Sequence, residues 1–217
     1  KRKAYQNQTG DIRRGVGMAL FSYKTGVWPI SLEIAGARLS LNQDGSVQLQ
    51  VGATEIGQGA DTVFSQMAAE TLHMDISRVH IVTQQDTDVT PFDTGAYASR
   101  QSFVTGTAVK ECAQQLKQKI LEYARTLVPG NVDRLELEDG YILADGKPAI
   151  SLEDLAMESY YSLSNSSVLT AEVSRQVKKN TVASGCCFAE VEVDMKLGKI
   201  KVLDIVNVHD SGTLLNP

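Results

Sequence analysis

The chain has 217 residues, 42% of them hydrophobic and 22% charged, an ordinary globular composition with enough apolar side chains for a core. Lysine and arginine total 21 against 26 aspartates and glutamates, and the net charge of −5 argues against a general nucleic-acid binder, which needs a basic surface. No apolar run approaches the roughly 18 residues of a membrane-spanning helix, so we expect no membrane partner.

Residues 1–28 are predicted to be a linker or leader from a preceding region, and residues 29–217 to be the domain itself. Residues 1–14 hold five basic side chains and one acidic side chain. That balance suits contact with a phosphate or an acidic partner, although a solvated leader is the favoured interpretation. The chain begins with Lys1, shows no signal peptide and stops at Pro217 directly after a strand-like run. We therefore expect a piece of a longer protein.

The first predicted elements form a hairpin. Residues 31–41 and 46–53 are both β-like, and a polar turn separates them. Val47, Leu49 and Val51 alternate with polar residues, which predicts a strand with one buried face.

Two longer helices are predicted next. Apolar side chains at helical spacing from Asp61 onward predict the first helix, and a short strand at 78–83 follows it. Residues 84–100 form a polar loop that is long for an idle connection. The second helix runs from about Ser102 to Leu127 and is ended by a Pro-Gly pair.

The second half of the chain gives shorter signals. In chain order these are strands at 135–138 and 141–143, a short helix with Ser151 as N-cap, and a final hairpin of strands at 182–194 and 199–208. The serine-rich run at 159–167 has no hydrophobic period, so we expect a mobile stretch over 159–181. Hairpins alternating with helices indicate an α+β fold, in which β-hairpins and a mixed sheet pack against two longer helices.

The cysteines do not suggest a disulfide framework, because their number is odd and two are adjacent. They are Cys112, Cys186 and Cys187. We expect three buried thiols in a reducing cytoplasm. The three histidines do not stand at metal-ligand spacing, so no metal-ligating residue is predicted.

A glycine-rich loop over 52–59 follows a strand and opens a helix. Its glycines let the backbone approach a ligand closely, and the free N–H groups of a helix start attract an anion. Gln58, between Gly57 and Gly59, has an unshielded amide that both donates and accepts. The spacing fits neither a dinucleotide-binding motif nor a P-loop. A plain strand-to-helix turn stays open as the alternative.

A second loop, residues 93–101, also opens onto a helix. Its small side chains leave main-chain N–H groups accessible. Arg100 at the helix start is unfavourable beside the helix dipole unless an anion lies between them, and the alternative is an arginine directed into solvent. Together the two loops are suited to hold one large anionic ligand.

Acidic residues alternate along one of the last predicted strands. Because Glu190, Glu192 and Asp194 share one face, we expect a solvated surface rather than paired catalytic carboxylates. His209 and Asp210 are the close histidine–carboxylate pair of the sequence. Neighbours on a strand point to opposite faces, which disfavours a catalytic dyad.

Three ordered stretches of the sequence resemble the molybdenum-cofactor subunit of the xanthine dehydrogenase/aldehyde oxidase family. They are EIGQGADTVFSQMAAETL, DTGAYASRQSFVTGTAV and the end AEVEVD…LGKIKVLDIVNVHDSGTLLNP. The resemblance covers most of residues 13–217 and is nearest to the bacterial xanthine dehydrogenases of the family. It implies that the chain is a segment of the molybdopterin-binding region.

The resemblance also implies an activity and its cofactors. The parent enzyme would hydroxylate a purine such as hypoxanthine or xanthine with oxygen from water, using molybdenum-molybdopterin, in bacteria often in its cytosine dinucleotide form. FAD and iron–sulfur clusters would lie on partner subunits or domains, beside the rest of the molybdenum subunit. The family's catalytic glutamate lies in a motif beyond residue 217. No catalytic residue is therefore expected in this chain, and the piece alone is expected to be inactive.

Carried over by position, seven residues are expected to bind the cofactor. In the first loop Gln58 would hydrogen-bond the pterin. In the second loop, main-chain N–H and polar groups would face the pyranopterin and its phosphate, with Ala98 near the metal. The full set is Gly57, Gln58, Gly59, Ala98, Ser99, Arg100 and Gln101.

Two other functions stay open. One is a non-catalytic interaction domain that uses the 84–100 loop and the basic residues of 1–14 to meet a partner. The other is a related hydroxylase that acts on aldehydes or other N-heterocycles. Two distant loops would favour the interaction domain, whereas a phosphate-containing ligand near Gln58 and Ser99 would favour a hydroxylase.

Overall fold

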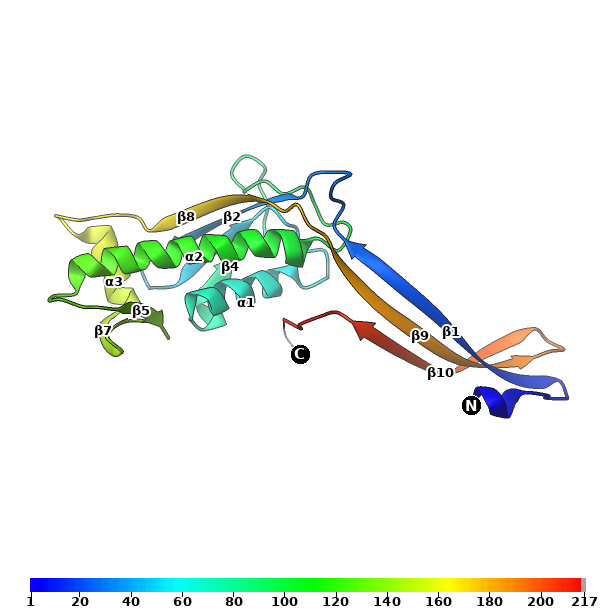
Figure 1. Cartoon of the computed structure of the whole chain (residues 1–217). Coiled ribbons are helices and arrows are strands. Elements are labelled where there is room, and N and C mark those ends of the chain that lie inside the picture. Colours follow the sequence, from blue (N-terminus) through cyan, green and yellow to red (C-terminus); the bar gives the residue numbers. More distant parts are fainter. Residues whose placement is uncertain (216–217) are drawn as a thin grey trace. The chain divides into compact units, whose positions relative to one another are not determined.

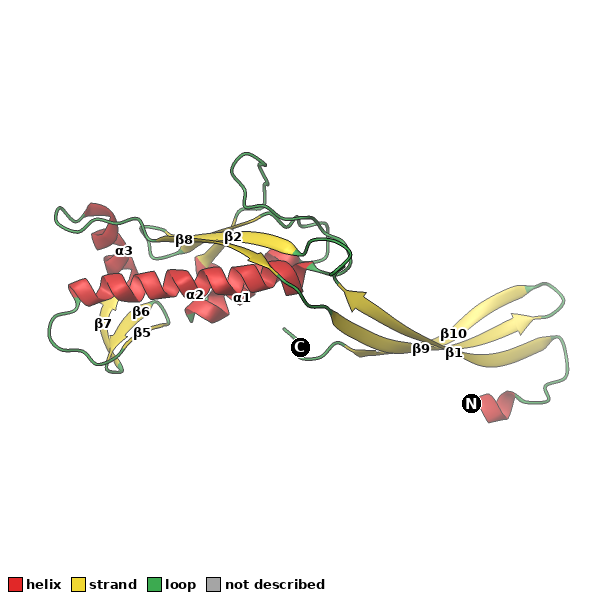
Figure 2. Ribbon diagram, turned by 45° about the horizontal axis from the view of Figure 1, so that its top comes forward, coloured by secondary structure: helices red, strands yellow, loops and turns green. Residues whose placement is uncertain are grey.

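The computed structural model describes residues 1–215 and contains two compact units, residues 26–179 and residues 1–25 together with those from 180 onward. Figure 1 follows the chain through its elements, and Figure 2 colours them by type. Asn216 and Pro217, which close the third resembling stretch, lie outside the described residues. The expected division into 1–28 and 29–217 stays a prediction.

A four-stranded mixed sheet forms the centre of the larger unit. Its strands are β2 (Ile34–Leu41), β3 (Val47–Val51), β4 (Val79–Ile81) and β8 (Thr170–Gln176). They lie in the order β4-β3-β2-β8, with β3 and β4 parallel and the other neighbours antiparallel. Leu39 pairs with Leu49 on one side and Ala171 on the other, so an apolar row crosses the sheet.

Two long helices cover this apolar row. They are α1 (Ala60–Leu72) and α2 (Gln101–Leu127), and both lie on the same side of the sheet (Figure 1, Figure 2). Helix α2 packs against β2, β8 and α1. Phe64 of α1 and Leu116 of α2 are fully buried, and the burial of each such side chain contributes about 1.5–3 kcal/mol to the stability of the fold. The predicted α+β fold with a mixed sheet and two longer helices is confirmed.

A small antiparallel sheet and a third helix complete the larger unit. The strands are β5 (Leu135–Glu138), β6 (Tyr141–Ala144) and β7 (Lys147–Ser151), in that order. Helix α3 (Leu152–Tyr161) begins after Ser151, whose hydroxyl accepts a hydrogen bond from the Asp154 N–H at 3.0 Å, as the N-cap prediction requires.

Two strands of this unit have no counterpart in the predicted elements. They are β7 and β8, and β8 falls within residues 159–181. Strand β8 is held by its pairing with β2, about 130 positions earlier in the chain, which no local hydrophobic period reveals. Whether residues 159–181 are mobile stays a prediction.

The second unit is a three-stranded antiparallel sheet. Its strands β1 (Ile12–Thr25), β9 (Thr181–Asp194) and β10 (Lys199–Asp210) lie in the order β1-β9-β10. The hairpin of β9 and β10 was predicted. Strand β1 was not, because Gly15, Gly17 and several polar residues blur its alternation and its partner strand lies far along the sequence.

The expected solvated face of β9 is wrong at Glu190. A short 3₁₀ helix, Arg2–Tyr5, follows Lys1, and the Lys1 ammonium lies 2.6 Å from the Glu190 carboxylate. Tyr5 donates a hydrogen bond to the same carboxylate, which is 8% exposed. The segment expected to be a solvated leader therefore covers part of the sheet.

All three cysteines are free thiols, as expected. The prediction that all three are buried holds for Cys112, which donates to the Ala171 carbonyl at 3.2 Å. It is wrong for Cys186 and Cys187, which are half-buried. The alternation of β9 gives these two neighbours opposite faces of a thin sheet, where neither face closes completely over a side chain.

Candidate functional site

Two loops that open the long helices touch each other in the larger unit. The first, residues 52–59, joins β3 to α1, and the second, residues 84–100, joins β4 to α2. A Cβ placed on Gly52 would lie 2.1 Å from the Pro91 carbonyl oxygen and 2.8 Å from the Asp93 nitrogen. Only glycine allows this approach, so Gly52 brings the two loops together.

The predicted residues Gln58 and Gln101 bridge the loops directly. The Gln58 Nε2 amide donates to Gln101 Oε1 and to the Thr54 carbonyl, the latter at 3.1 Å. Gln101 Nε2 donates to the same carbonyl at 3.1 Å. Gln58 Oε1 accepts one bond, from the Ile56 N–H at 2.7 Å. A carbonyl oxygen has two lone pairs, so exposed Gln58 retains one acceptor site for a ligand.

The start of α1 is occupied by a carboxylate of the chain itself. Glu55 accepts hydrogen bonds from the N–H groups of Gly57 at 2.6 Å, Gly59 at 3.1 Å and Asp61 at 3.2 Å. The bond from Gly59 contributes most to holding the pKa of Glu55 below its usual value. The expectation of free N–H groups at this helix start is therefore wrong, because Glu55 supplies the anion.

Asp61, in the first turn of α1, contrasts with Glu55 because one of its carboxylate oxygens lacks a hydrogen-bond donor. Its Oδ1 atom is buried and has no hydrogen-bond partner among the described residues. Burial, with the nearby charge of Glu55, raises the pKa of the Asp61 carboxyl. A buried oxygen without a donor marks a place where a ligand N–H group would be favourable.

The Arg100 side chain is neither directed into solvent nor left facing a ligand anion. It is fully buried, and its Nε donates to Glu33 at 2.6 Å while Nη1 donates to Asp93 at 2.5 Å. Nη1 also reaches the Gly95 carbonyl at 2.9 Å, and Nη2 the Ile34 carbonyl at 2.8 Å. Burial lowers the pKa of this guanidinium, but the two carboxylates outweigh burial and raise it. They are the anions that the helix start required.

Glu33 was missed by sequence reasoning. It is a fully buried acidic side chain just before β2, within a stretch interpreted as a strand. The signal that points to it is a lone glutamate in an otherwise apolar run, since a buried charge must be paired. Asp93 stood at the edge of the predicted loop without an assigned role.

The turn before α2 is strained and presents main-chain donors. Ala98 and Ser99 have φ angles of 47° and 50°, in the left-handed region that disfavours residues other than glycine. The Ala98 carbonyl accepts from the Gly26 N–H at 2.8 Å. Exposed Ser99 makes no hydrogen bond to the described residues, and the first two N–H groups of α2, those of Gln101 and Ser102, have no intrahelical acceptor.

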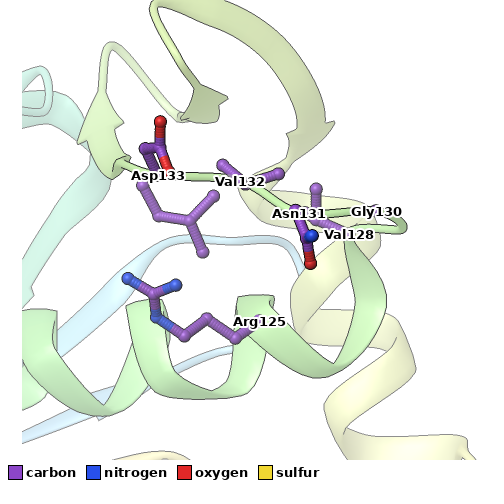
Figure 3. Close-up of a pocket in the computed structure, with 7 residues that line it drawn as sticks. Arg125, Val128, Gly130, Asn131, Val132 and Asp133 are labelled. Carbon is purple, nitrogen blue, oxygen red and sulfur yellow. The ribbon is translucent and has the colours of Figure 1, made fainter.

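A separate hollow of about 360 Å³ lies at the far end of α2 (Figure 3). Arg125 projects from the helix toward the following loop, which carries Asn131 and Asp133. This hollow lies about 25 residues along α2 from Gln101, so it is not part of the two-loop site. Within residues 1–215, no group of three or more potential metal ligands is present, and no helix has the length and apolar character needed to cross a membrane.

Comparisons with known proteins place this geometry in context. Residues 1–217 match the family model described as the molybdopterin cofactor-binding domain. The chain is 49% identical over 220 residues to the putative xanthine dehydrogenase molybdenum-binding subunit XdhA of Escherichia coli (strain K12), covering 100% of this chain and 29% of that protein. It is 31% identical to the probable hypoxanthine oxidase XdhD of the same organism, covering 97% of this chain and 22% of that one.

A solved structure shares the fold. The crystal structure of the Cu,Mo-CO dehydrogenase in its carbon monoxide-reduced state superposes with a TM-score of 0.82 at 24% identity, over 99% of this chain and 28% of that chain. The chain therefore spans less than a third of the length of each of these relatives.

Proposed function

The chain belongs to the molybdopterin cofactor-binding domain family, and on that premise we propose that its two joined loops form part of the cradle for a molybdenum-molybdopterin cofactor. The observation that supports this most is the bridge between Gln58 and Gln101, which brings both predicted loops to one place. The proposed binding residues are Gly57, Gln58, Gly59, Ala98, Ser99 and Gln101, whereas Arg100, with its guanidinium buried and its N–H bonded to the Tyr97 carbonyl, supports this loop from inside the protein.

The hydrogen-bonding groups of the two loops are complementary to different parts of such a ligand. The α1 loop offers an acceptor at the exposed Gln58 Oε1, which suits an N–H group of a pterin ring. The α2 loop and the start of α2 offer donors, at the N–H groups of Ser99, Gln101 and Ser102, which suit a phosphate. We therefore assign the phosphate to the start of α2, since Glu55 fills the start of α1.

The activity we propose belongs to a longer polypeptide. By likeness to the 49% identical relative, that polypeptide oxidises a purine, hypoxanthine or xanthine, with water as the oxygen source. The bound molybdenum centre supplies the redox and oxygen-transfer chemistry. Gln58 and the 98–101 loop bind and orient it. We assign no catalytic residue to this chain and expect the 217-residue piece alone to be inactive.

The proposal extends to the partner subunits, the form of the pterin and the cellular location. We propose contact with the rest of the molybdenum subunit and electron transfer to partner-borne iron–sulfur clusters and FAD, with the pterin in its cytosine dinucleotide form. Three free thiols are compatible with a cytoplasmic location. A related hydroxylase acting on aldehydes or other N-heterocycles is the second candidate, supported by likeness to the nicotine 6-hydroxylase large subunit of Paenarthrobacter nicotinovorans, which is 23% identical over 94% of this chain.

The test uses the complete polypeptide, purified beside the 217-residue piece. Molybdenum is measured by mass spectrometry, pterin by its fluorescent oxidation product, and activity by xanthine-dependent reduction of a dye. We expect about one molybdenum per complete polypeptide with xanthine oxidation, and neither with the piece alone. A complete polypeptide without molybdenum or pterin would contradict cofactor binding. A loaded polypeptide that oxidises an aldehyde but not a purine would support the second candidate.

A further inference from the structure

The guanidinium of Arg100 is placed where it cannot contact a ligand at the surface. The side chain is 0% exposed, as is Asp93, and Glu33 is 1% exposed. Each of its three nitrogens has a partner inside the protein. A role for this side chain as the cation that meets a phosphate is therefore excluded by its surroundings.

The partners of Arg100 are themselves held by hydrogen bonds from three segments of the chain. Glu33 accepts from the Val27 N–H at 2.5 Å. Asp93 accepts from the Gly95 N–H at 2.8 Å and from the Thr105 hydroxyl of α2 at 2.7 Å. The buried cluster thus ties the chain before β2, the 84–100 loop and the first turns of α2 into one rigid unit.

The strained turn adjoins this cluster directly. Ala98 and Ser99, both left-handed, immediately precede Arg100. Backbone conformations of this kind persist where surrounding contacts over-determine them. The Ala98 carbonyl is held by Gly26 on one side, and the Arg100 side chain anchors the other side.

We propose that Arg100 is a positioning residue of the cofactor site, whose buried guanidinium holds the left-handed turn so that the Ser99 N–H faces the ligand. The inference rests on the proposed function. A lysine at this position keeps the charge but lacks the planar fork that reaches two carboxylates at once. Glycine adopts positive φ without strain, so glycine at Ala98 and Ser99 relieves the need for the anchor.

The experiment uses the complete polypeptide isolated with its cofactor. The variants are Arg100→Lys alone, Arg100→Lys combined with Ala98→Gly and Ser99→Gly, and the matched surface control Arg134→Lys, whose partner Glu136 lies at the surface. Bound molybdenum and pterin per polypeptide are measured together with thermal unfolding. We expect Arg100→Lys to lower cofactor content about tenfold, the glycine pair to restore it to within about twofold, and the control to match wild type.

Several results would overturn the proposal. Arg100→Lys with wild-type cofactor content would show that the planar guanidinium is not needed. A folded variant that combines Arg100→Lys with the two glycine substitutions but does not recover cofactor content would show that Arg100 does not act by holding the turn. If Arg100→Lys does not unfold cooperatively, the test uses Thr105→Val, which removes the hydroxyl that donates to Asp93. Reduced cofactor content with normal unfolding of this variant supports the proposal, and unchanged cofactor content overturns it. A wild-type polypeptide without cofactor would instead contradict the proposed function on which the inference rests.

Discussion

The side-chain amide of Gln58 donates a hydrogen bond to the side-chain oxygen of Gln101, 43 positions later in the chain. Gln101 is 8% exposed and is fixed by its own bond to the Thr54 carbonyl, so it holds the Gln58 side chain in place. Through this pair, acceptors from the α1 loop and donors from the start of α2 share one place. A ligand with N–H groups at one end and a phosphate at the other matches that order.

Replacing Gln58 by Ala removes both the bridge to Gln101 and the free acceptor site. In the complete polypeptide we expect cofactor affinity to fall by about 1–3 kcal/mol, which is roughly 5- to 150-fold. Molybdenum retained after dialysis measures this loss. Gln118→Ala is the matched control, because Gln118 is an exposed glutamine on helix α2 that bonds only to Glu122 within the described residues. Equal molybdenum in both variants would remove Gln58 from the site.

Gly52→Ala tests how the two loops are brought together. A Cβ there meets the Pro91 carbonyl oxygen at 2.1 Å, so the 84–100 loop must shift. We expect the free energy of unfolding to fall by about 1–3 kcal/mol. Trp28, the single tryptophan, reports urea unfolding of the larger unit by its fluorescence. Wild type is the reference, and identical midpoints for wild type and Gly52→Ala would refute the close contact.

Glu55→Gln tests the anion built into the start of α1. Bonds from backbone N–H groups, led by Gly59, lower the pKa of Glu55 below its ordinary value of 4.5. A carboxylate with a depressed pKa stabilises the folded state above that ordinary value, and the effect is lost as pH falls through the folded value. Urea unfolding should therefore show wild type more stable than the variant near neutral pH, with the difference shrinking under acid. A pH-independent difference would rule this out.

Asp61→Asn should act in the opposite direction. Burial and the charge of Glu55 raise the pKa of Asp61 above 3.8, so its ionised form costs stability at higher pH. We expect the variant without cofactor to be more stable than wild type at about pH 7, and this gain to vanish as pH falls below 3.8. Lower stability at neutral pH would mean that Oδ1 has a partner in solution.

The three thiols should differ in reactivity. Burial raises the pKa of the Cys112 thiol to about 11, whereas Cys186 and Cys187 are half-buried. Because the thiolate is the nucleophile, iodoacetamide at about pH 8 should alkylate the adjacent pair and spare Cys112. Peptide mass spectrometry identifies the labelled sites, and labelling in denaturant should reach all three. Alkylation of Cys112 at the rate of Cys187 would contradict its burial.

The parts of the fold that were predictable have a local cause. The period of apolar residues marks α1 and α2, and small residues beside a helix start mark the two loops. The parts that were missed depend on contacts between distant positions. Arg100 meets Glu33 across 67 positions, and strand β1 finds its partner β9 near the other end of the chain. Glu55 was visible in the sequence, but its return to the N–H groups of Gly57 and Gly59 depends on a turn geometry that residue type alone does not specify.

The most direct test is a crystal structure of the complete polypeptide with its cofactor bound. The cradle described here predicts a phosphate oxygen within about 3 Å of the Ser99 nitrogen and a pterin nitrogen at similar distance from Gln58 Oε1, with Arg100 still paired to Glu33 and Asp93. A cofactor bound away from both loops would contradict the central claim. So would a phosphate that displaces Glu55 from the start of α1.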